Sequence, residues 1–247
     1  RTKYALAREM LVELSELLPK GYRVYVLFDS WYASAKLIKF CRRQRWHVIC
    51  AVKSNRRLNR QRMDHHNQSL RNKRYQRVTL QALDPSRPSQ TYCVRSVQGH
   101  LEEVADEVCG IISKRHPGDK YPKYFVCTDL TLTVQQVLQY YQRRWPVEVD
   151  NLYLKEALGL GDFRLQSFEA TEKWFAVVVL AMNYLQYQAA VAYLQTQSVC
   201  SLTDIIRQHR LAHWRQFLRK ALTQLLRSRN IDATIESLLP AASWAVT

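Results

Sequence analysis

The sequence predicts an α/β fold in which a mixed sheet flanked by helices is interrupted by a mostly β insertion and followed by C-terminal helices. Helical and strand-like segments alternate at the start of the chain, β-type patterns fill the middle, and long helical patterns follow residue 130. With 247 residues, 47% of them hydrophobic, the chain can bury a large core, which excludes a mostly disordered protein.

The first 52 residues predict a helix, a strand, a second helix and a second strand. Leucines at helical spacing indicate a helix over residues 4–18, which Pro19 to Gly21 ends. Val24–Phe28 and Trp46–Val52 are short runs of β-forming residues, typical of strands buried on both faces. Residues 33–45 have an amphipathic helical pattern between them, so we expect a right-handed parallel strand-helix-strand unit.

Asp29 directly follows the first predicted strand. Open α/β sheets place functional groups at such strand ends, because the strand is rigid and the turn opens outward. Alternatively, Asp29 or Ser30 caps the next helix. Its position alone leaves both interpretations open.

The segment from 53 to 77 holds nine basic residues and one acidic residue. Charge of a single sign between strand-like segments favours a phosphate-binding surface over a solvated loop. Asp64, His65 and His66 within it form only a weak candidate for a metal site, since no matching ligand pair is apparent. The candidate DNA-contacting residues are Lys53, Arg56, Arg57, Arg60, Arg62, Arg71, Lys73 and Arg74.

The middle of the chain predicts further strands. Residues 75–97 alternate in the manner of two strands, and Lys123–Cys127 is an apolar run typical of another. Pro85, Pro88 and Gly99 are interpreted as breaks between them. This part of the chain is therefore expected to be a mostly β insertion.

A capping box predicts the start of the next helix, with Thr133 as N-cap and Gln136 three positions later. Pro146 falls inside this helical pattern and should kink it or mark a second helical segment beginning near Trp145. Glu148 would then lie within about a turn of a helix start, where unpaired amide groups favour anions.

Helical patterns continue over residues 168–195, apolar on all sides and therefore expected to be buried, and over residues 202–229, which are basic. The longest apolar run, Trp174–Met182, is shorter than the roughly 20 residues of a membrane span, so we expect no transmembrane segment. His209 and His213 are four residues apart, but without a third ligand nearby they are interpreted as surface residues.

The overall charge favours a polyanionic partner. Lys and Arg number 37 against 21 Asp and Glu, a net charge of +16, which favours nucleic acid over a small metabolite. The six cysteines form no Cys-x-x-Cys pair, so reduced thiols in a cytosolic protein are expected. The chain opens without Met and runs directly into a helical pattern, which suggests a piece of a longer protein.

Four side chains of different chemistry share one predicted helical face. On a regular helix of roughly 100° per residue, Tyr141, Arg144, Glu148 and Lys155 fall within an arc of about 60°. A carboxylate can hold a divalent metal ion, two cations can hold phosphates, and a tyrosine can brace a sugar or base.

These spacings match the Y-(2)-R-(3)-E-(6)-K signature of DDE transposases from bacterial insertion sequences, which the chain therefore resembles. Phe28 to Tyr32 resembles the strand end that carries the second catalytic aspartate of that family. The separation of 119 positions from Asp29 to Glu148 is enough for the β-rich insertion found in the branch it resembles. The resemblance implies an RNase H-like fold.

The resemblance also implies a function and its residues. Asp29 and Glu148 would be catalytic and bind two Mg²⁺ ions, for which Mn²⁺ would substitute, while Arg144, Lys155 and Tyr141 would bind DNA phosphates. The reaction would be metal-dependent strand cleavage and transfer at the ends of an insertion sequence. The partners would be double-stranded DNA and a second copy of the protein in a synaptic complex, in the bacterial cytosol and away from membranes.

One catalytic residue of the family has no counterpart here. Its first aspartate lies on an earlier strand, and no strand is predicted before residue 4, so we expect that residue upstream and this chain alone to be inactive. Asp129 follows an apolar strand but is better interpreted as a turn or capping residue. Asp150 and Glu156 would project away from Glu148.

Three rival functions remain. They are a non-catalytic or repurposed transposase-derived DNA-binding protein, a generic RNase H-like nuclease, and a scaffold or membrane-surface protein.

The predicted organisation has four segments. The segments are 1–53, the first part of the RNase H-like core; 54–129, the basic β-rich insertion; 130–200, the catalytic and buried helices of the core; and 201–247, a basic helical region.

Overall fold

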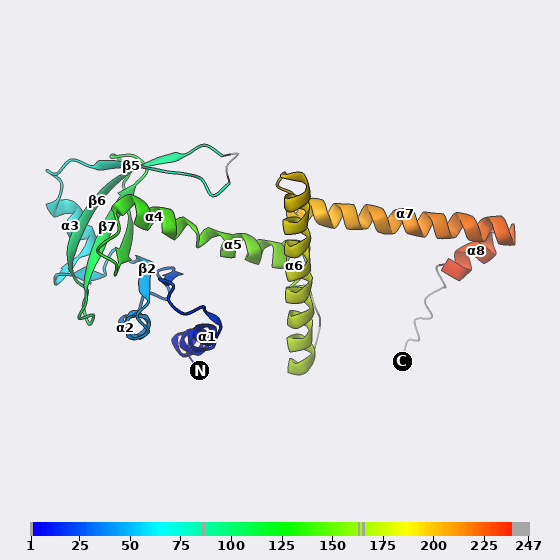
Figure 1. Cartoon of the computed structure of the whole chain (residues 1–247), viewed down its shortest axis with the longest axis horizontal. Coiled ribbons are helices and arrows are strands. Elements are labelled where there is room, and N and C mark those ends of the chain that lie inside the picture. The colour runs from blue at the N-terminus through cyan, green and yellow to red at the C-terminus, as the bar shows by residue number, and fades with distance from the viewer. Residues whose placement is uncertain (1, 85–86, 163, 165, 239–247) are drawn as a thin grey trace. The chain divides into compact units, whose positions relative to one another are not determined.

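The computed structural model describes residues 2–84, 87–162, 164 and 166–238, which form two compact units, Arg1–Glu148 and Val149–Thr247 (Figure 1). Pro85 and residues 239–247, on which parts of the sequence predictions fall, lie outside the described residues. The four-segment organisation stays a prediction.

A six-stranded mixed sheet forms the centre of the first unit, as the sequence predicted, in the order β1-β2-β8-β7-β6-β5. β1 and β2 are parallel, which confirms the predicted pairing, and the other neighbouring strands are antiparallel. The β-rich segment thus continues the same sheet through the pairing of β8 with β2. The strands are β1 (Tyr25–Phe28), β2 (His47–Val52), β5 (Gln76–Leu80), β6 (Gln90–His100), β7 (Glu107–Lys114) and β8 (Lys123–Cys127).

Helices cover both faces of this sheet. α1 (Lys3–Leu17), α2 (Ala35–Arg43) and α3 (Met63–Ser69) contribute to one apolar core, around Val48 and Val126. α4 (Val134–Gln142) packs on the opposite face, around Ile49 and Phe125. Alternate residues of β2 and β8 enter the two cores, because neighbouring side chains of a strand point to opposite faces.

The antiparallel register of β8 determines where the acidic strand ends lie. Ile49 of β2 pairs with Cys127 at the end of β8, and His47 pairs with Tyr25 at the start of β1. Asp129 therefore lies beside the first residues of β1 and β2, whereas Asp29 follows the last residue of β1. The two aspartates occupy opposite ends of the sheet.

Some elements of the β-rich segment were not predicted. β7 and the hairpin of β3 (Arg57–Leu58) and β4 (Gln61–Arg62) are additional. Gly99 lies inside β6 and is not a break, so that interpretation was wrong. A β-carbon at Gly99 would collide with the side-chain amide of Asn59, so the glycine permits a close approach of the hairpin.

The second unit is helical and contains η1 (Tyr153–Ala157), α6 (Phe168–Thr196), α7 (Leu202–Ser228) and α8 (Ile231–Leu238), while α5 (Trp145–Leu152) spans the division between the units. The predicted helices near 168–195 and 202–229 are confirmed as α6 and α7.

The predicted burial of α6 is wrong. Val178, Met182 and Leu185 are buried, but Val177 is 58% and Leu180 is 68% exposed. The buried stripe is narrow because the small core of this unit draws on one side of α6, where Met182 and Leu185 meet residues of α7. By length and composition alone, α6 could cross a membrane, and it is the one helix among the described residues that could. Core helices of soluble proteins share these properties.

Candidate active site

Asp29 forms a local turn at the end of β1 and does not cap α2. Its Oδ1 accepts a hydrogen bond from the backbone N–H of Trp31 at 2.9 Å. The cap of α2 is Ser34, whose Oγ accepts from the N–H of Leu37 at 3.2 Å. The interpretation of Asp29 or Ser30 as the helix cap is therefore wrong. The turn uses Oδ1, which leaves Oδ2 of Asp29 as the oxygen that could bind a cation.

Helix α4 brings Tyr141 against the sheet. The predicted capping box is present: Thr133 Oγ1 accepts from Gln136 N–H at 3.2 Å, and Gln136 Oε1 accepts from Thr133 N–H at 2.9 Å. Two turns later, the ring of Tyr141 lies against Phe125 of β8, with 4.8 Å between ring centroids. The helix is thus fixed at its start by the cap and along one face by its apolar contacts.

The phenol of Tyr141 connects Asp29 to the helix. Burial raises the pKa of Tyr141, the cation of Arg144 opposes that rise, and the negative charge of Asp29 adds to it. Residues from a strand end and from a helix distant in sequence are therefore close enough to interact electrostatically. The sequence spacing alone could not show this electrostatic interaction.

Arg144, which lies between α4 and α5, forms an ion pair with Glu148 four residues later. Nη1 of Arg144 donates to Oε1 of Glu148 at 2.8 Å, and the two side chains are 20% and 47% exposed. Burial works against the charge of Arg144, but the contacts with Glu148 and Tyr141 raise its pKa overall. Nε of Arg144 is buried and has no hydrogen-bond partner among the described residues. This orphan donor could bind an anion.

The helix carrying these residues is broken where Pro146 predicted. α4 ends at Gln142, and α5 begins at Trp145, so Pro146 lies in the first turn of a new helix. Glu148 belongs to that first turn, as expected. A proline is tolerated there because first-turn amides have no partner within the helix.

Lys155 lies in the π-helical segment η1, is exposed, and belongs to the second unit. The predicted 60° arc assumed one regular helix from Tyr141 to Lys155, and that assumption was wrong. The helix is interrupted between Gln142 and Trp145 and changes to π geometry at Tyr153. Both changes alter the angle per residue on which the arc depended.

Asp129 is a turn residue, in agreement with its interpretation from the sequence. Its carboxylate is 3% exposed and accepts hydrogen bonds from Tyr25 Oη at 2.6 Å and from Thr131 Oγ1 at 2.6 Å and N–H at 3.0 Å. Burial alone would raise the pKa of Asp129, but these hydrogen bonds and nearby His47 lower it to about 2. Because it lies at the other end of the sheet, Asp129 does not join Asp29.

No group of three or more His, Cys, Asp or Glu side chains suited to a metal ion occurs among the described residues. Asp64 is instead paired with Arg62 at 2.6 Å, and Nε2 of His66 lies 2.8 Å from the carbonyl of Leu58. Asp29 and Glu148 nevertheless have the hard carboxylate oxygens that Mg²⁺ prefers; Asp29 is a partly exposed residue, and the Glu148 side chain is 47% exposed. The fit is that of an incomplete ligand set.

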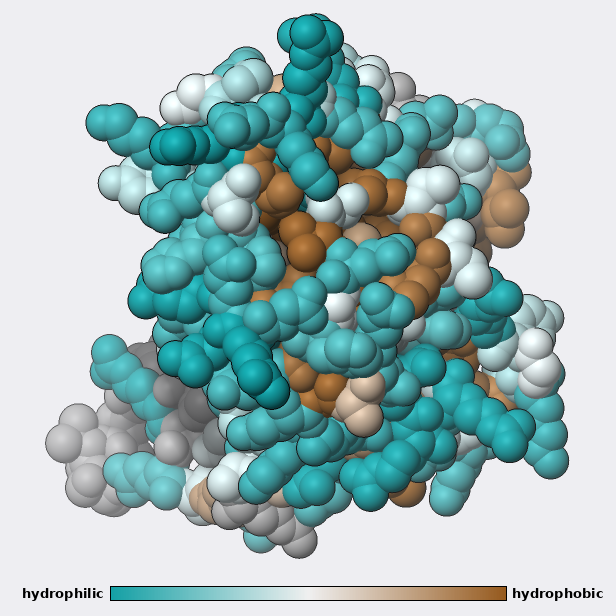
Figure 2. All heavy atoms as spheres, turned by 90° about the vertical axis from the view of Figure 1, so that its left-hand side faces the viewer, coloured by the Kyte–Doolittle hydropathy of each residue, from teal (hydrophilic) through white to brown (hydrophobic). Residues whose placement is uncertain are grey.

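The eight predicted basic residues differ in the hydrogen bonds and ion pairs that they form within the protein. Arg56 donates to the carbonyl of Glu102 at 3.3 Å, and Arg62 is bound to Asp64, so these two have structural roles. Arg57 contacts Glu102 only at 3.9 Å. Most of the molecular face in Figure 2 is hydrophilic. The exposed members of this set, which could contact DNA, are Lys53, Arg57, Arg60, Arg71, Lys73 and Arg74.

Sequence reasoning missed a cation that supports this basic segment. The guanidinium of Arg95 stacks on Tyr75, 3.7 Å from the ring centroid, and donates to the carbonyls of Arg71 and Lys73. Arg95 lies on β6, outside the charge run. The pairing of β6 with β5 is the feature that could have indicated its closeness to the basic segment. It holds in place the loop that carries Arg71 and Lys73.

Comparison with known proteins identifies a family for this chain. Residues 4–184 match the family model described as a transposase DDE domain. No curated protein matches the sequence.

The fold resembles that of a solved piggyBac transposase, the cryo-EM structure of a synaptic complex with hairpin DNA. The TM-score is 0.51 at 16% sequence identity, and the match covers 100% of this chain and 47% of that chain, so this protein spans about half the length of its structural relative. The likeness agrees with the RNase H-like fold predicted from the sequence. With the family match over most of its length, the chain belongs to the DDE-domain transposases.

Proposed function

We propose that this protein is the catalytic part of a transposase that cuts double-stranded DNA at the ends of an insertion sequence and joins those ends to a target. The supporting observations are the ion pair of Arg144 with Glu148 and the effects of the Arg144 and Asp29 charges on the pKa of Tyr141, which link the four residues within the first unit. Family membership supports polynucleotidyl transfer as the class of chemistry.

Asp29 and Glu148 are the proposed ligands of two Mg²⁺ ions, and Mn²⁺ would bind the same oxygens. When bound, such ions activate a water or a DNA 3′-hydroxyl and stabilise the leaving oxygen. Glu148 suits this role because its carboxylate lies in the first turn of α5 and is 47% exposed. Asp29 suits it because its carboxylate follows the rigid end of β1 and is held by the hydrogen bond from the Trp31 N–H.

Arg144, Lys155 and Tyr141 are the proposed phosphate contacts. The buried Nε of Arg144 has no acceptor among the described residues, and a phosphate oxygen would supply one. The Tyr141 hydroxyl interacts with Arg144 and would lie beside the same phosphate. Lys155 is exposed in a π-helical turn, a geometry frequent at functional sites.

We further propose that two copies act together in a synaptic complex, on DNA in the bacterial cytosol. The net charge of +16 supports association with DNA, since each neutralised phosphate releases counterions.

One observation favours a second candidate, a transposase-derived DNA-binding protein without catalysis. The converging residues supply two carboxylates, Asp29 and Glu148, and the described residues contain no group of three metal-binding side chains. Two carboxylates hold a pair of divalent ions less well than the three of the family. We therefore expect the 247-residue chain alone to bind DNA without cutting it.

Cleavage by the full gene product separates the two candidates. The assay would use a labelled duplex carrying an element end, with Mg²⁺. We expect Glu148→Gln to abolish cutting and to leave DNA affinity within about twofold, because the change removes a metal ligand and retains the side-chain volume. Glu169→Gln is the matched control, since Glu169 pairs with Lys173 on α6 and has no proposed catalytic role.

Retained cutting by Glu148→Gln would show that Glu148 is not catalytic. A wild-type gene product that binds the duplex and leaves it uncut would support the DNA-binding candidate. Cutting by the 247-residue chain alone would show that the third carboxylate is among its own residues.

A further inference from the structure

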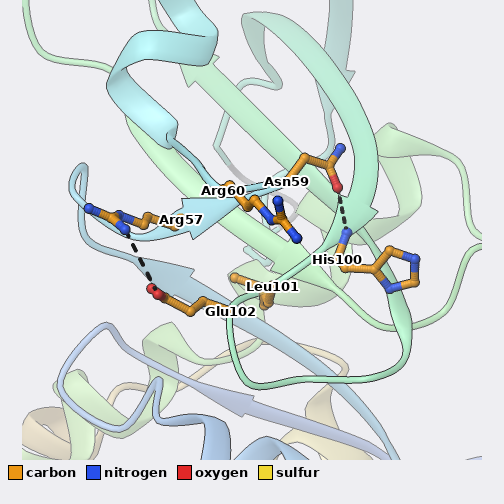
Figure 3. Close-up of a pocket in the computed structure, with 6 residues that line it drawn as sticks. All are labelled: Arg57, Asn59, Arg60, His100, Leu101 and Glu102. Atoms are coloured by element: carbon orange, nitrogen blue, oxygen red, sulfur yellow. Dashed lines mark hydrogen bonds and ion pairs between the residues drawn. The ribbon is translucent and has the colours of Figure 1, made fainter.

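A hollow of about 570 Å³ lies beside the β3–β4 hairpin in the first unit. Its lining combines three groups that can carry positive charge, Arg57, Arg60 and His100, with the carboxylate of Glu102 (Figure 3). Asn59 and Leu101 complete the lining, and Leu101 is 2% exposed. The chemistry of this hollow is that of a site for an anion.

The hairpin beside the hollow is held firmly on the sheet. Leu58 is fully buried and forms a β-bridge with Leu101. Its Cδ2 is 2.7 Å from the position that a β-carbon would occupy at Gly110, so the absence of a side chain on β7 makes room for it. The guanidinium of Arg57 therefore extends from a strand whose next residue is fixed in the core.

The hairpin turn is fastened separately by Asn59. Its Oδ1 accepts from the N–H of His100 at 2.8 Å, its Nδ2 donates to the carbonyl of Gln98 at 3.2 Å, and its own N–H donates to the carbonyl of His100 at 2.9 Å. Three hydrogen bonds to one strand fix the tip of the hairpin relative to β6. Arg60 follows directly, so its backbone is positioned before any ligand binds.

Arg60 occupies a backbone conformation that favours glycine. The two-residue turn has φ angles of 50° at Asn59 and 65° at Arg60. Such hairpin turns prefer Asn followed by Gly, because the second position is left-handed. An arginine there is strained, and strained residues cluster at functional sites. The strain suggests that the guanidinium of Arg60 is retained for binding.

The ion pairs of the hairpin show which arginines are free to bind a ligand and which are already bound to an acidic side chain. Arg62 binds both oxygens of Asp64, at 3.0 and 2.6 Å. Arg57 is 3.9 Å from Glu102, and both side chains are more than half exposed, so this contact is weak and exchangeable. Arg60 is exposed and lines the hollow. Arg57 and Arg60 can therefore turn to a ligand, while Arg62 cannot do so without leaving Asp64.

We propose that this hollow binds a backbone phosphate of duplex DNA, with Arg60 as the main donor and Arg57 exchanging Glu102 for the phosphate. This inference rests on the proposed function as a DNA-acting protein, and it names a contact separate from Asp29 and Glu148. A phosphate contact of this kind positions DNA without reading its sequence.

The test is the salt dependence of duplex binding by the full 247-residue chain, followed by fluorescence anisotropy. We expect Arg60→Gly to make the negative slope of log K against log salt concentration shallower by about 0.9, the value for one lost phosphate contact. Because glycine relieves the left-handed strain, this variant should melt no lower than wild type. Arg60→Gln tests the charge with a long polar side chain retained and should make the slope shallower by the same amount.

Arg62→Gln is the matched control on the same hairpin and should leave the slope unchanged. An unchanged slope in both Arg60 variants, with tight binding by the wild type, would overturn this phosphate site and leave the proposed function intact. Equal losses in the Arg60 and Arg62 variants would also overturn it, since diffuse charge would then explain binding. No duplex binding by the wild-type chain would refute the proposed function itself.

Discussion

Nη1 of Arg144 lies 2.8 Å from Oε1 of Glu148, so the side chain proposed to bind phosphate is ion-paired with the side chain proposed to bind metal. A cation bound by Glu148 and a phosphate bound by Arg144 would each take over part of this pair. Without ligands, the contact keeps the Glu148 carboxylate beside Arg144 and partly neutralises both charges. The two proposed binding events are thus linked through one hydrogen bond.

The first prediction concerns the effect of Arg144 on Tyr141. Burial raises the pKa of Tyr141, and the cation of Arg144 opposes this rise. Replacing Arg144 with Met should therefore raise the Tyr141 pKa further, because the phenolate loses its nearby positive charge. NMR titration of tyrosine labelled at Cζ would measure the shift. Arg143→Met is the control, since Arg143 lies over the neighbouring Tyr140 ring; equal shifts in both variants would contradict a specific interaction.

The second prediction concerns the stability that Asp129 contributes. Its pKa is lowered from 3.8 to about 2, so the folded protein favours the carboxylate. That contribution is fully present above about pH 4 and is lost as the pH falls through 2; a shift of this size corresponds to on the order of 2 kcal/mol. Asp129→Asn should lower the free energy of unfolding by about that amount at pH 7 and by much less near pH 2.

Urea unfolding of the wild type and Asp129→Asn at several pH values would measure this difference. The gap between the two proteins should narrow as the solution is acidified. A gap that stays constant from pH 7 to pH 2 would show that the ionised carboxylate is not the source of the stability.

The third prediction concerns the packing of the β3–β4 hairpin against Gly99 of β6. A β-carbon at Gly99 would collide with the Asn59 amide, so Gly99→Ala should destabilise the protein by about 1–3 kcal/mol. Gly118→Ala is the matched control, because nothing lies within 4 Å of its added carbon. Adding Asn59→Ala to Gly99→Ala should recover part of the loss, since the colliding group is removed. Thermal unfolding of a double-mutant cycle would detect this coupling, and strict additivity would contradict it.

Features predicted correctly from the sequence depend on residues close together in the chain. The cap formed by Thr133 and Gln136 satisfies amides within one turn of itself, and Pro146 ends regular helix bonding through its own ring. The mostly apolar run from 108 to 112 could have indicated β7, whose residues there are buried, because a strand covered on both faces is continuously apolar.

Predictions that failed depend on which other surfaces meet a segment. The apolar composition of α6 indicated burial, but only one stripe of it is covered in this chain. The β3–β4 hairpin escaped prediction because its left-handed turn holds Asn59 and Arg60 in place of a glycine signal. Its stability comes from β6 and β7, about 40 to 50 residues further along the chain.

The sequence by itself determined the chemical identities at the candidate site, since residue types and spacings identified Tyr141, Arg144, Glu148 and Lys155, and a strand end identified Asp29. Only the tertiary structure decided which of them interact. Antiparallel pairing of β8 with β2 carries Asp129 to the far end of the sheet, while the packing of α4 brings Tyr141 within the field of Asp29. Local patterns arise from neighbouring residues, whereas register and helix packing arise from hydrogen bonds and apolar contacts between distant ones.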